Sequence, residues 1–334
     1  MPAMMKAIVL ERFGEPSEVL QVREVPVPKP GPGEVLVRMI ASPINPSDLL
    51  MVRGRYVVLP SLPATPGFEG VGVVTEAGPG LLGPWVKGKR VVAINDKGGN
   101  WAEYAVIKAR QARPVADDIP DEQAASLFVN PMTALAMVRH VLKVKHGDWV
   151  LQAAAGSNLG HMIVRLGKVD GFKTINVVRR REAMTWIKDL GGDVVLCSED
   201  GPIDEQVRAI EPGGVPFALD PVGGVTGSQL LKSLAPRGRL LIFGGLSEQP
   251  VMIDPRPLIG GRQTIEGFWL GHWMRAQSIP KALRLFREVA GLIRAGVLRT
   301  ETGPGLTLNE VGQADTAAKA GKPLLWLDPS RRPK

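Results

Sequence analysis

Cysteine is almost absent from this sequence of 334 residues, in which Cys197 stands alone. A single cysteine cannot form an internal disulfide, and no Cys-x-x-Cys pair is present to hold a structural zinc ion. The four histidines form no ligand cluster with that cysteine, so the sequence predicts no metal site. Disulfides are typical of oxidising compartments, and we therefore expect a cytoplasmic protein.

Long hydrophobic runs are also absent, since no window holds the 18 or more apolar residues that a membrane span requires. The amino-terminal stretch MPAMMKAIVLERFG has only a short apolar run before its first acidic residue. That stretch matches neither a signal peptide nor an Arg- and Ser-rich transit peptide. We expect neither membrane insertion nor secretion.

The charge balance is positive, with a formal net charge of +8 and an isoelectric point near 9.7. The cations are scattered, apart from three arginines at 179–181 and the basic tail, and no basic helix interleaved with aromatic residues appears. This pattern disfavours nucleic-acid binding as the main function. A composition of 44% hydrophobic and 22% charged residues is typical of a soluble globular chain, and the length predicts about two domains.

Two kinds of pattern divide the chain. Up to about residue 124, short β-branched runs such as EVLVRMI and GVGVV alternate with Pro- and Gly-rich turns, which predicts a compact and mostly antiparallel β domain. Beyond it, helical periods alternate with single apolar strands, as parallel βαβ units require. The expected strands of this doubly wound domain are 149–153, 174–178, 194–197, 217–220, 239–243 and 264–268.

The carboxyl-terminal part predicts a discontinuous architecture. An amphipathic helix spans about 279–293, and the apolar stretch PLLWL has strand character that would let it rejoin the first domain. The fold class is therefore α/β, with a β-rich domain at 1–124, a six-stranded doubly wound domain at 125–270, and a return to the first domain at 271–334.

The first strand of the α/β half runs into AAAGSNLG, residues 153–160, and then into a helix. A strand, a turn of small residues and a helix N-terminus favour the pyrophosphate of a dinucleotide. The strict G-x-G-x-x-G is missing, and a plain tight turn is the alternative interpretation. The predicted cofactor contacts here are Ala155, Gly156, Ser157, Asn158, Leu159 and Gly160.

The second strand ends in NVVRRR, where a protein that prefers NAD would carry a carboxylate for the ribose hydroxyls. A carboxylate repels a 2′-phosphate, whereas the guanidinium groups of Arg179 and Arg181 can bind one. The sequence therefore predicts NADPH as the cofactor. The alternative is a group of solvated arginines that opens a helix.

The order of these elements resembles the medium-chain dehydrogenase/reductase superfamily, in which a GroES-like domain carries an inserted Rossmann domain. The segments KAIVLERFGEPSEVL, GFEGVGVVTEAG, KGKRVVA and NWAEYAV are similar to landmarks of that superfamily. Its zinc-dependent branch carries Cys and His where this sequence has Asn45, Ser47, Asp48 and Phe68. The resemblance therefore implies the zinc-independent branch.

Within that branch, NPSDLLMVRGRY, VNPMTA, NVVRRR and GFWLGHW resemble the mitochondrial-type 2-enoyl thioester reductases. The turn AAAGSNLG departs from the superfamily's Gly-Gly-Val-Gly. The resemblance implies NADPH-dependent reduction of the C2–C3 double bond of trans-2-enoyl thioesters of CoA or an acyl carrier protein, by a homodimer. An NADPH:quinone or enone reductase is the alternative, and a non-catalytic protein that binds NADPH and nucleic acid is a distant one.

The same resemblance implies the catalytic side chains. Tyr56 would stabilise the enolate and donate a proton, because a phenol is protonated at neutral pH; packing on Leu59 or Leu62 is the alternative. Asn45 would orient substrate or nicotinamide, or else serve only in a turn. Ligands lie at the carboxyl ends of parallel strands. The nicotinamide and the acyl pocket would therefore be lined by Thr133, Gly244, Gly245, Phe268, Trp269 and Leu270. Trp269 would form a wall of the catalytic site, and a core role is the alternative for each aromatic residue.

Overall fold

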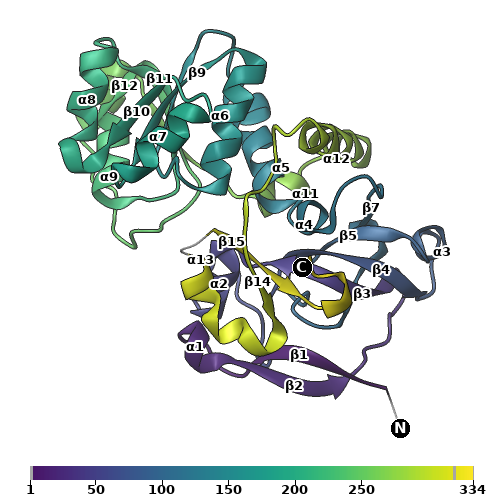
Figure 1. Ribbon diagram of the computed structural model, residues 1–334. Coiled ribbons are helices and arrows are strands. Elements are labelled where there is room, and N and C mark those ends of the chain that lie inside the picture. The colour runs from purple at the N-terminus through teal and green to yellow at the C-terminus, as the bar shows by residue number, and fades with distance from the viewer. Residues whose placement is uncertain (1–2, 319–320, 334) are drawn as a thin grey trace. The chain divides into compact units, whose positions relative to one another are not determined.

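The computed structural model describes residues 3–318 and 321–333 and divides the chain into two compact units. The first consists of Met1–Val129 and Thr300–Lys334, and the second of Asn130–Arg299. The expected α/β architecture with an inserted six-stranded domain is confirmed. The first unit is discontinuous, as the terminal apolar stretch predicted (Figure 1).

The return to the first unit comes at Thr300 and not at 271 as expected. Arg139 explains the difference, because its guanidinium bonds Asp170 at 2.7 Å and Glu288 at 2.5 Å. These contacts hold the amphipathic helix α12 (Ile279–Arg294) on the second unit. The helix also buries Leu285 and Val289 on one face, as its sequence pattern predicted.

The first unit is built on a seven-stranded sheet in the order β14-β15-β3-β4-β5-β7, with β6 also paired to β3. Every pairing is antiparallel except β14 with β15, and β1 with β2 forms a separate antiparallel pair. The strands are β1 (Met4–Leu10), β2 (Leu20–Pro26), β3 (Glu34–Pro43), β4 (Glu69–Ala77), β5 (Arg90–Ile94), β6 (Tyr104–Lys108), β7 (Ala112–Pro114), β14 (Thr302–Thr307) and β15 (Lys322–Trp326). The helices are α1 (Pro16–Val19), α2 (Pro46–Val52), α3 (Leu82–Val86), α4 (Asp121–Ala125) and α13 (Ala314–Ala318), with 3₁₀ turns at Ala109–Gln111, Leu308–Gln313 and Pro329–Arg331.

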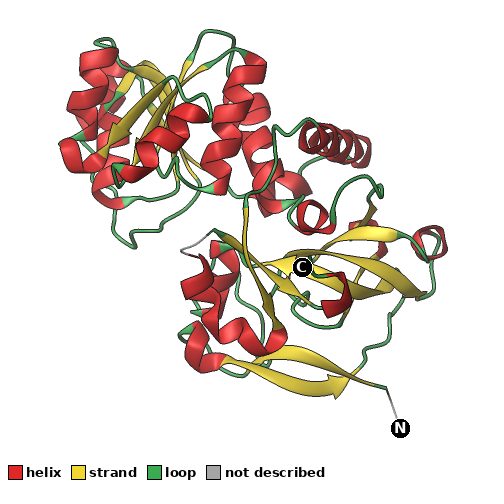
Figure 2. Cartoon of the chain, in the orientation of Figure 1, coloured by secondary structure: helices red, strands yellow, loops and turns green. Residues whose placement is uncertain are grey.

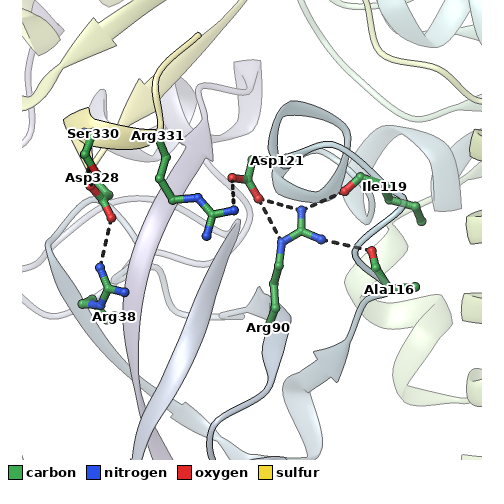
Figure 3. Close-up of polar contacts among 8 residues, drawn as sticks. All are labelled: Arg38, Arg90, Ala116, Ile119, Asp121, Asp328, Ser330 and Arg331. Atoms are coloured by element: carbon green, nitrogen blue, oxygen red, sulfur yellow. Dashed lines mark hydrogen bonds and ion pairs between the residues drawn. The ribbon is translucent and has the colours of Figure 1, made fainter.

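Residues 322–331 are fixed to the first unit by apolar and ionic contacts. All five residues of β15 are buried, because the strand lies between β14 and β3 inside the sheet. Beyond it, Asp121 accepts an ion pair from Arg90 at 2.6 Å and one from Arg331 at 2.8 Å (Figure 3). Because the Arg90 and Asp121 side chains are about nine-tenths buried, removing either partner would leave a buried charge unpaired, which costs more than breaking an exposed pair.

The second unit is an all-parallel sheet in the order β10-β9-β8-β11-β12-β13, with helices on both faces (Figure 2). The six strands expected from the sequence all occur, and β12 begins earlier than expected. They are β8 (Trp149–Gln152), β9 (Lys173–Val178), β10 (Val194–Cys197), β11 (Val215–Asp220), β12 (Leu234–Ile242) and β13 (Thr264–Gly267). The helical segments are α5 (Val129–Leu135), a π-helical stretch at Ala136–Leu142, α6 (Asn158–Asp170), α7 (Glu182–Asp189), a 3₁₀ turn at Ser198–Asp200, α8 (Ile203–Ile210), α9 (Gly224–Lys232), α10 (Pro255–Gly261) and α11 (Leu270–Arg275).

The chain reversal in strand order falls between β8 and β11, and in such sheets ligands bind beyond the carboxyl ends of the strands at this point. None of the helices in residues 3–318 and 321–333 has the length and apolar character needed to cross a membrane.

Candidate active site

Asn45 lies at the N-terminal end of α2, in the first unit, and is 1% exposed. Its backbone N–H donates to the Asp48 carboxylate at 2.8 Å, which is how an acidic residue at the third helical position caps a helix. The other Asp48 oxygen accepts from the backbone N–H of Phe68 at 3.0 Å. Burial raises the pKa of Asp48 to about 7, although these two backbone donors act in the opposite direction. Asp48 therefore ties Asn45 to the start of β4.

Glu69 is fully buried and joins three segments of the first unit. One carboxylate oxygen accepts from the backbone N–H groups of Phe128 and Val129 at 3.0 and 2.9 Å. The other accepts from the Asn45 side-chain amide at 3.1 Å. Glu69 thereby fixes the orientation of the Asn45 amide, whose own oxygen accepts no hydrogen bond from the described residues.

Lys322 supplies the positive charge of this cluster from the start of β15. Its ammonium lies 3.7 Å from Glu69, and its side chain is only 4% exposed. Burial lowers the pKa of Lys322, while the carboxylates of Glu69 and Asp48 oppose that shift. We refer to Asn45, Asp48, Glu69 and Lys322 as the buried polar cluster. The N-x-x-D spacing of a helix cap is a sequence signal for Asp48, but Asp48, Glu69 and Lys322 are not among the functional residues predicted from the sequence.

Tyr56 follows α2 in a loop and is partly buried against the hydrophobic core of the first unit. Its ring packs on Phe68, with the ring centroids 5.1 Å apart and the ring planes at 36°. Because Asp48 bonds the backbone of Phe68, Tyr56 and Asn45 both contact the Asp48–Phe68 connection. The structure thus brings the two predicted catalytic residues of the first unit to one region.

The turn between β8 and α6 in the second unit is tight and leads directly into a capped helix N-terminus. Ser157 caps α6 by accepting from the Gly160 N–H at 3.1 Å. A Cβ on Gly160 would lie 2.4 Å from the Ala155 carbonyl oxygen, so only glycine permits this packing, whereas Gly156 faces open space. Ala154 adopts a left-handed φ of 50°, a strained conformation often found at functional turns. The predicted residues Ala155, Gly156, Ser157, Asn158, Leu159 and Gly160 all lie in this turn and the first turn of α6.

Arg179 and Arg181 follow β9, the parallel neighbour of β8, and are exposed. The carboxyl ends of these two strands lie at one edge of the sheet, so the arginines flank the β8–α6 turn. The Arg181 guanidinium pairs with the Asp200 carboxylate at 2.5 Å. This acidic partner is not predictable from the sequence pattern, because Asp200 follows a different strand.

The remaining predicted contacts belong to the second unit. Gly244 and Gly245 follow β12, and Phe268 follows its neighbour β13, with the Phe268 N–H donating to the Ile242 carbonyl at 2.8 Å. Trp269 precedes α11, and the Arg275 guanidinium lies 4.7 Å from its ring centroid. Thr133 in α5 and Leu270 in α11 are buried, at 7% and 8% exposure. The carboxyl ends of β12 and β13 are therefore followed by five of the predicted residues: Gly244, Gly245, Phe268, Trp269 and Leu270.

The described residues contain no group of three His, Cys, Asp or Glu side chains arranged to hold a metal ion. A dinucleotide fits the chemistry of the second unit: the positive dipole end of α6 follows directly on β8, Gly160 permits close packing, and two guanidinium groups follow the next strand.

Comparisons with known proteins agree with this architecture. Residues 31–117 match the family model described as an alcohol dehydrogenase GroES-like domain, and residues 159–288 match the one described as a zinc-binding dehydrogenase. The mitochondrial enoyl-[acyl-carrier-protein] reductase of Rattus norvegicus is 35% identical over 331 residues, which cover 98% of this chain and 88% of that protein.

Two solved structures are also similar. A putative NADPH:quinone reductase from Bacillus thuringiensis has a TM-score of 0.89 at 31% identity, and the match covers 97% of this chain and 99% of that one. A mycobacterial protein solved in complex with NADPH has a TM-score of 0.87 at 30% identity, covering 96% and 99% of the two chains. A GroES-like unit that carries an inserted Rossmann unit defines a class of oxidoreductases. The chain belongs to the medium-chain dehydrogenase/reductase superfamily.

Proposed function

We propose that this oxidoreductase reduces the C2–C3 double bond of trans-2-enoyl thioesters with NADPH. The observation that carries the proposal is that Tyr56 packs on Phe68, whose backbone N–H donates to the same Asp48 carboxylate as the backbone N–H of Asn45. The similarity to mitochondrial enoyl-[acyl-carrier-protein] reductases over nearly the whole chain supports the same substrate class. The acyl group would arrive on CoA or on an acyl carrier protein.

NADPH is the proposed cofactor and would supply a hydride to the β-carbon of the substrate. The N-terminus of α6, capped by Ser157, would hold the pyrophosphate through backbone N–H groups. Arg179 and Arg181 would bind the 2′-phosphate. Neighbours named as NADPH-dependent or solved with NADPH support this choice.

Tyr56 would act on the thioester itself. As negative charge develops on the thioester oxygen, the phenol O–H donates a hydrogen bond to that oxygen and lowers the barrier to enolate formation. The Tyr56 proton then passes to the α-carbon, directly or through a water molecule, and the phenolate recovers a proton from solvent. Formation of a C–H bond at each carbon completes the saturated thioester.

Asn45 and Trp269 would position the reacting groups. Glu69 holds the Asn45 amide in one orientation through a buried hydrogen bond, so that the amide can serve as a fixed polar group. Trp269 would wall the acyl pocket, with Thr133, Gly244, Gly245, Phe268 and Leu270 around the nicotinamide. The proposed role of each of these residues can be tested by site-directed replacement.

Quinone or enone reduction is the second candidate, because structural neighbours from Bacillus thuringiensis and Mesorhizobium loti carry the name putative NADPH:quinone reductase. Turnover of crotonyl-CoA and a benzoquinone, measured side by side as NADPH oxidation, separates the two functions. We expect the higher kcat/KM with crotonyl-CoA. A strong preference for the quinone would reject the enoyl thioester proposal. Cytoplasmic location and a homodimer, both expected from the sequence, stay predictions.

A further inference from the structure

The carboxyl ends of β9 and β10 carry opposite charges that lie in contact. Arg181 follows β9, Asp200 follows β10, and these strands are parallel neighbours in register at Val178 and Cys197. The Arg181 guanidinium and the Asp200 carboxylate are 2.5 Å apart, with 72% and 31% of the two side chains exposed. A group that the sequence assigns to the cofactor's 2′-phosphate therefore already has an anionic partner.

The loop that carries Asp200 is held in place by its neighbours. The Gln206 side-chain amide donates to the carbonyl oxygens of Cys197 at 3.1 Å and Gly201 at 2.9 Å, on either side of the 3₁₀ turn. The Cys197 thiol donates to the Arg179 carbonyl at 3.4 Å and links the two strand ends. The backbone on both sides of Asp200 is thus held in place, and its start is linked to Arg179.

From this geometry we propose that Asp200 limits the preference for NADPH over NADH, as an internal counter-ion that a 2′-phosphate must displace from Arg181. The proposal rests on the NADPH site proposed above. A phosphate bound to Arg181 lies within one Debye length, about 8 Å, of the displaced carboxylate, and the two anions repel each other. Asp200 therefore weakens NADPH binding and leaves NADH binding nearly unchanged. As a result, the affinity for NADPH exceeds the affinity for NADH by a smaller factor than it would without Asp200.

Replacement of Asp200 by asparagine removes the charge and keeps the size of the side chain. An exposed ion pair and a screened repulsion are each small, so we expect 2′,5′-ADP to bind roughly three- to tenfold more tightly to Asp200→Asn. Binding of 5′-AMP, which lacks the 2′-phosphate, should change by less than about twofold because the lost repulsion acts on that phosphate.

Calorimetric titration of the whole protein with 2′,5′-ADP and with 5′-AMP tests the proposal without turnover. Glu199→Gln is the matched control, because it removes a neighbouring charge that has no part in the Arg181–Asp200 pair. The gain in Asp200→Asn should shrink in 0.5 M NaCl and disappear in an Arg181→Ala background. A matching rise in the NADPH to NADH ratio of kcat/KM is expected.

Equal or weaker binding of 2′,5′-ADP by Asp200→Asn would overturn the proposal, and so would an equal gain in Glu199→Gln. The role of Asp200 is tested by the ratio of the 2′,5′-ADP affinity of Asp200→Asn to that of the wild type. The NADPH preference is decided separately by the wild type, since equal binding of 2′,5′-ADP and 5′-AMP would reject that preference. Failure of both nucleotides to bind either protein would reject both.

Discussion

Replacing Lys322 with methionine removes the cation that faces Glu69 across 3.7 Å inside the first unit. At an effective dielectric constant near 20, unit charges at that distance attract by about 4–5 kcal/mol. Because Glu69 is fully buried, its charge would remain without a counter-ion, and breaking such a pair costs about 3–5 kcal/mol. With roughly 2–4 °C of Tm for each kcal/mol in a domain of this size, we expect a fall in Tm of roughly 6–20 °C.

Differential scanning calorimetry of four proteins measures the effect: wild type, Lys322→Met, Glu69→Gln, and the double variant. A glutamine at 69 could keep an acceptor for the Phe128 and Val129 N–H groups and donate to the Asn45 amide oxygen, which lacks a partner among the described residues. The double variant has no unpaired charge at either position. We therefore expect it to unfold at a higher temperature than Lys322→Met alone.

Lys87→Met is the matched control for this series, since Lys87 is exposed at the end of α3 and its loss should change Tm by no more than about 2 °C. A Tm for Lys322→Met within about 2 °C of the wild type would show that Lys322 does not compensate the buried charge of Glu69. Stability losses that simply add in the double variant would also refute it, because they would show no coupling between the two charges.

Three further predictions concern single positions. Burial raises the pKa of Asp48 to about 7, so the folded state binds more protons than the unfolded state between pH 4 and 7. The free energy of unfolding should therefore fall as pH rises through that window. Asp48→Asn should make this pH dependence weaker, as measured by urea denaturation at a series of pH values. Gly160→Ala should weaken NADPH binding at least tenfold, measured by fluorescence titration, because its Cβ would lie 2.4 Å from a backbone oxygen; unchanged affinity would contradict the packing argument. Asp121→Asn should lower the free energy of unfolding by about 2–4 kcal/mol, since two arginines lose their shared anion; a loss below about 0.5 kcal/mol would show that the ion pairs are dispensable.

The parallel sheet was predictable because its strands are short apolar runs set between helical periods. The six expected strands lie at β8 to β13, and the apolar PLLWL forms most of β15 with its flanking Lys322. The point at which the chain returns to the first unit was expected at 271 and lies at Thr300. The amphipathic pattern of α12 shows that one face of the helix is buried, but it does not show which surface covers that face. Contacts from Arg139 decide that question, and they join residues about 150 positions apart.

The candidate site was predictable in part for the same kind of reason. The β8–α6 turn and the arginines after β9 could be located from strand order, since parallel strands end at one edge of the sheet. The buried polar cluster was missed because Glu69 and Lys322 are charged residues in otherwise apolar runs, and charged residues are rarely buried unless paired. Their pairing joins β4 to β15, and no local pattern contains that contact. Asp200 was missed because its partner is likewise on another strand end.

We propose above that the Tyr56 phenol takes part in reduction of an enoyl thioester. The direct measurement is kcat for NADPH oxidation with crotonyl-CoA in Tyr56→Phe, with Tyr104→Phe in β6 as the matched control. Loss of a general acid should lower kcat about 10²- to 10⁴-fold, while the Kd for NADPH and the Tm stay close to those of the wild type. Tyr56→Phe with full kcat toward crotonyl-CoA would exclude a catalytic role for the Tyr56 phenol.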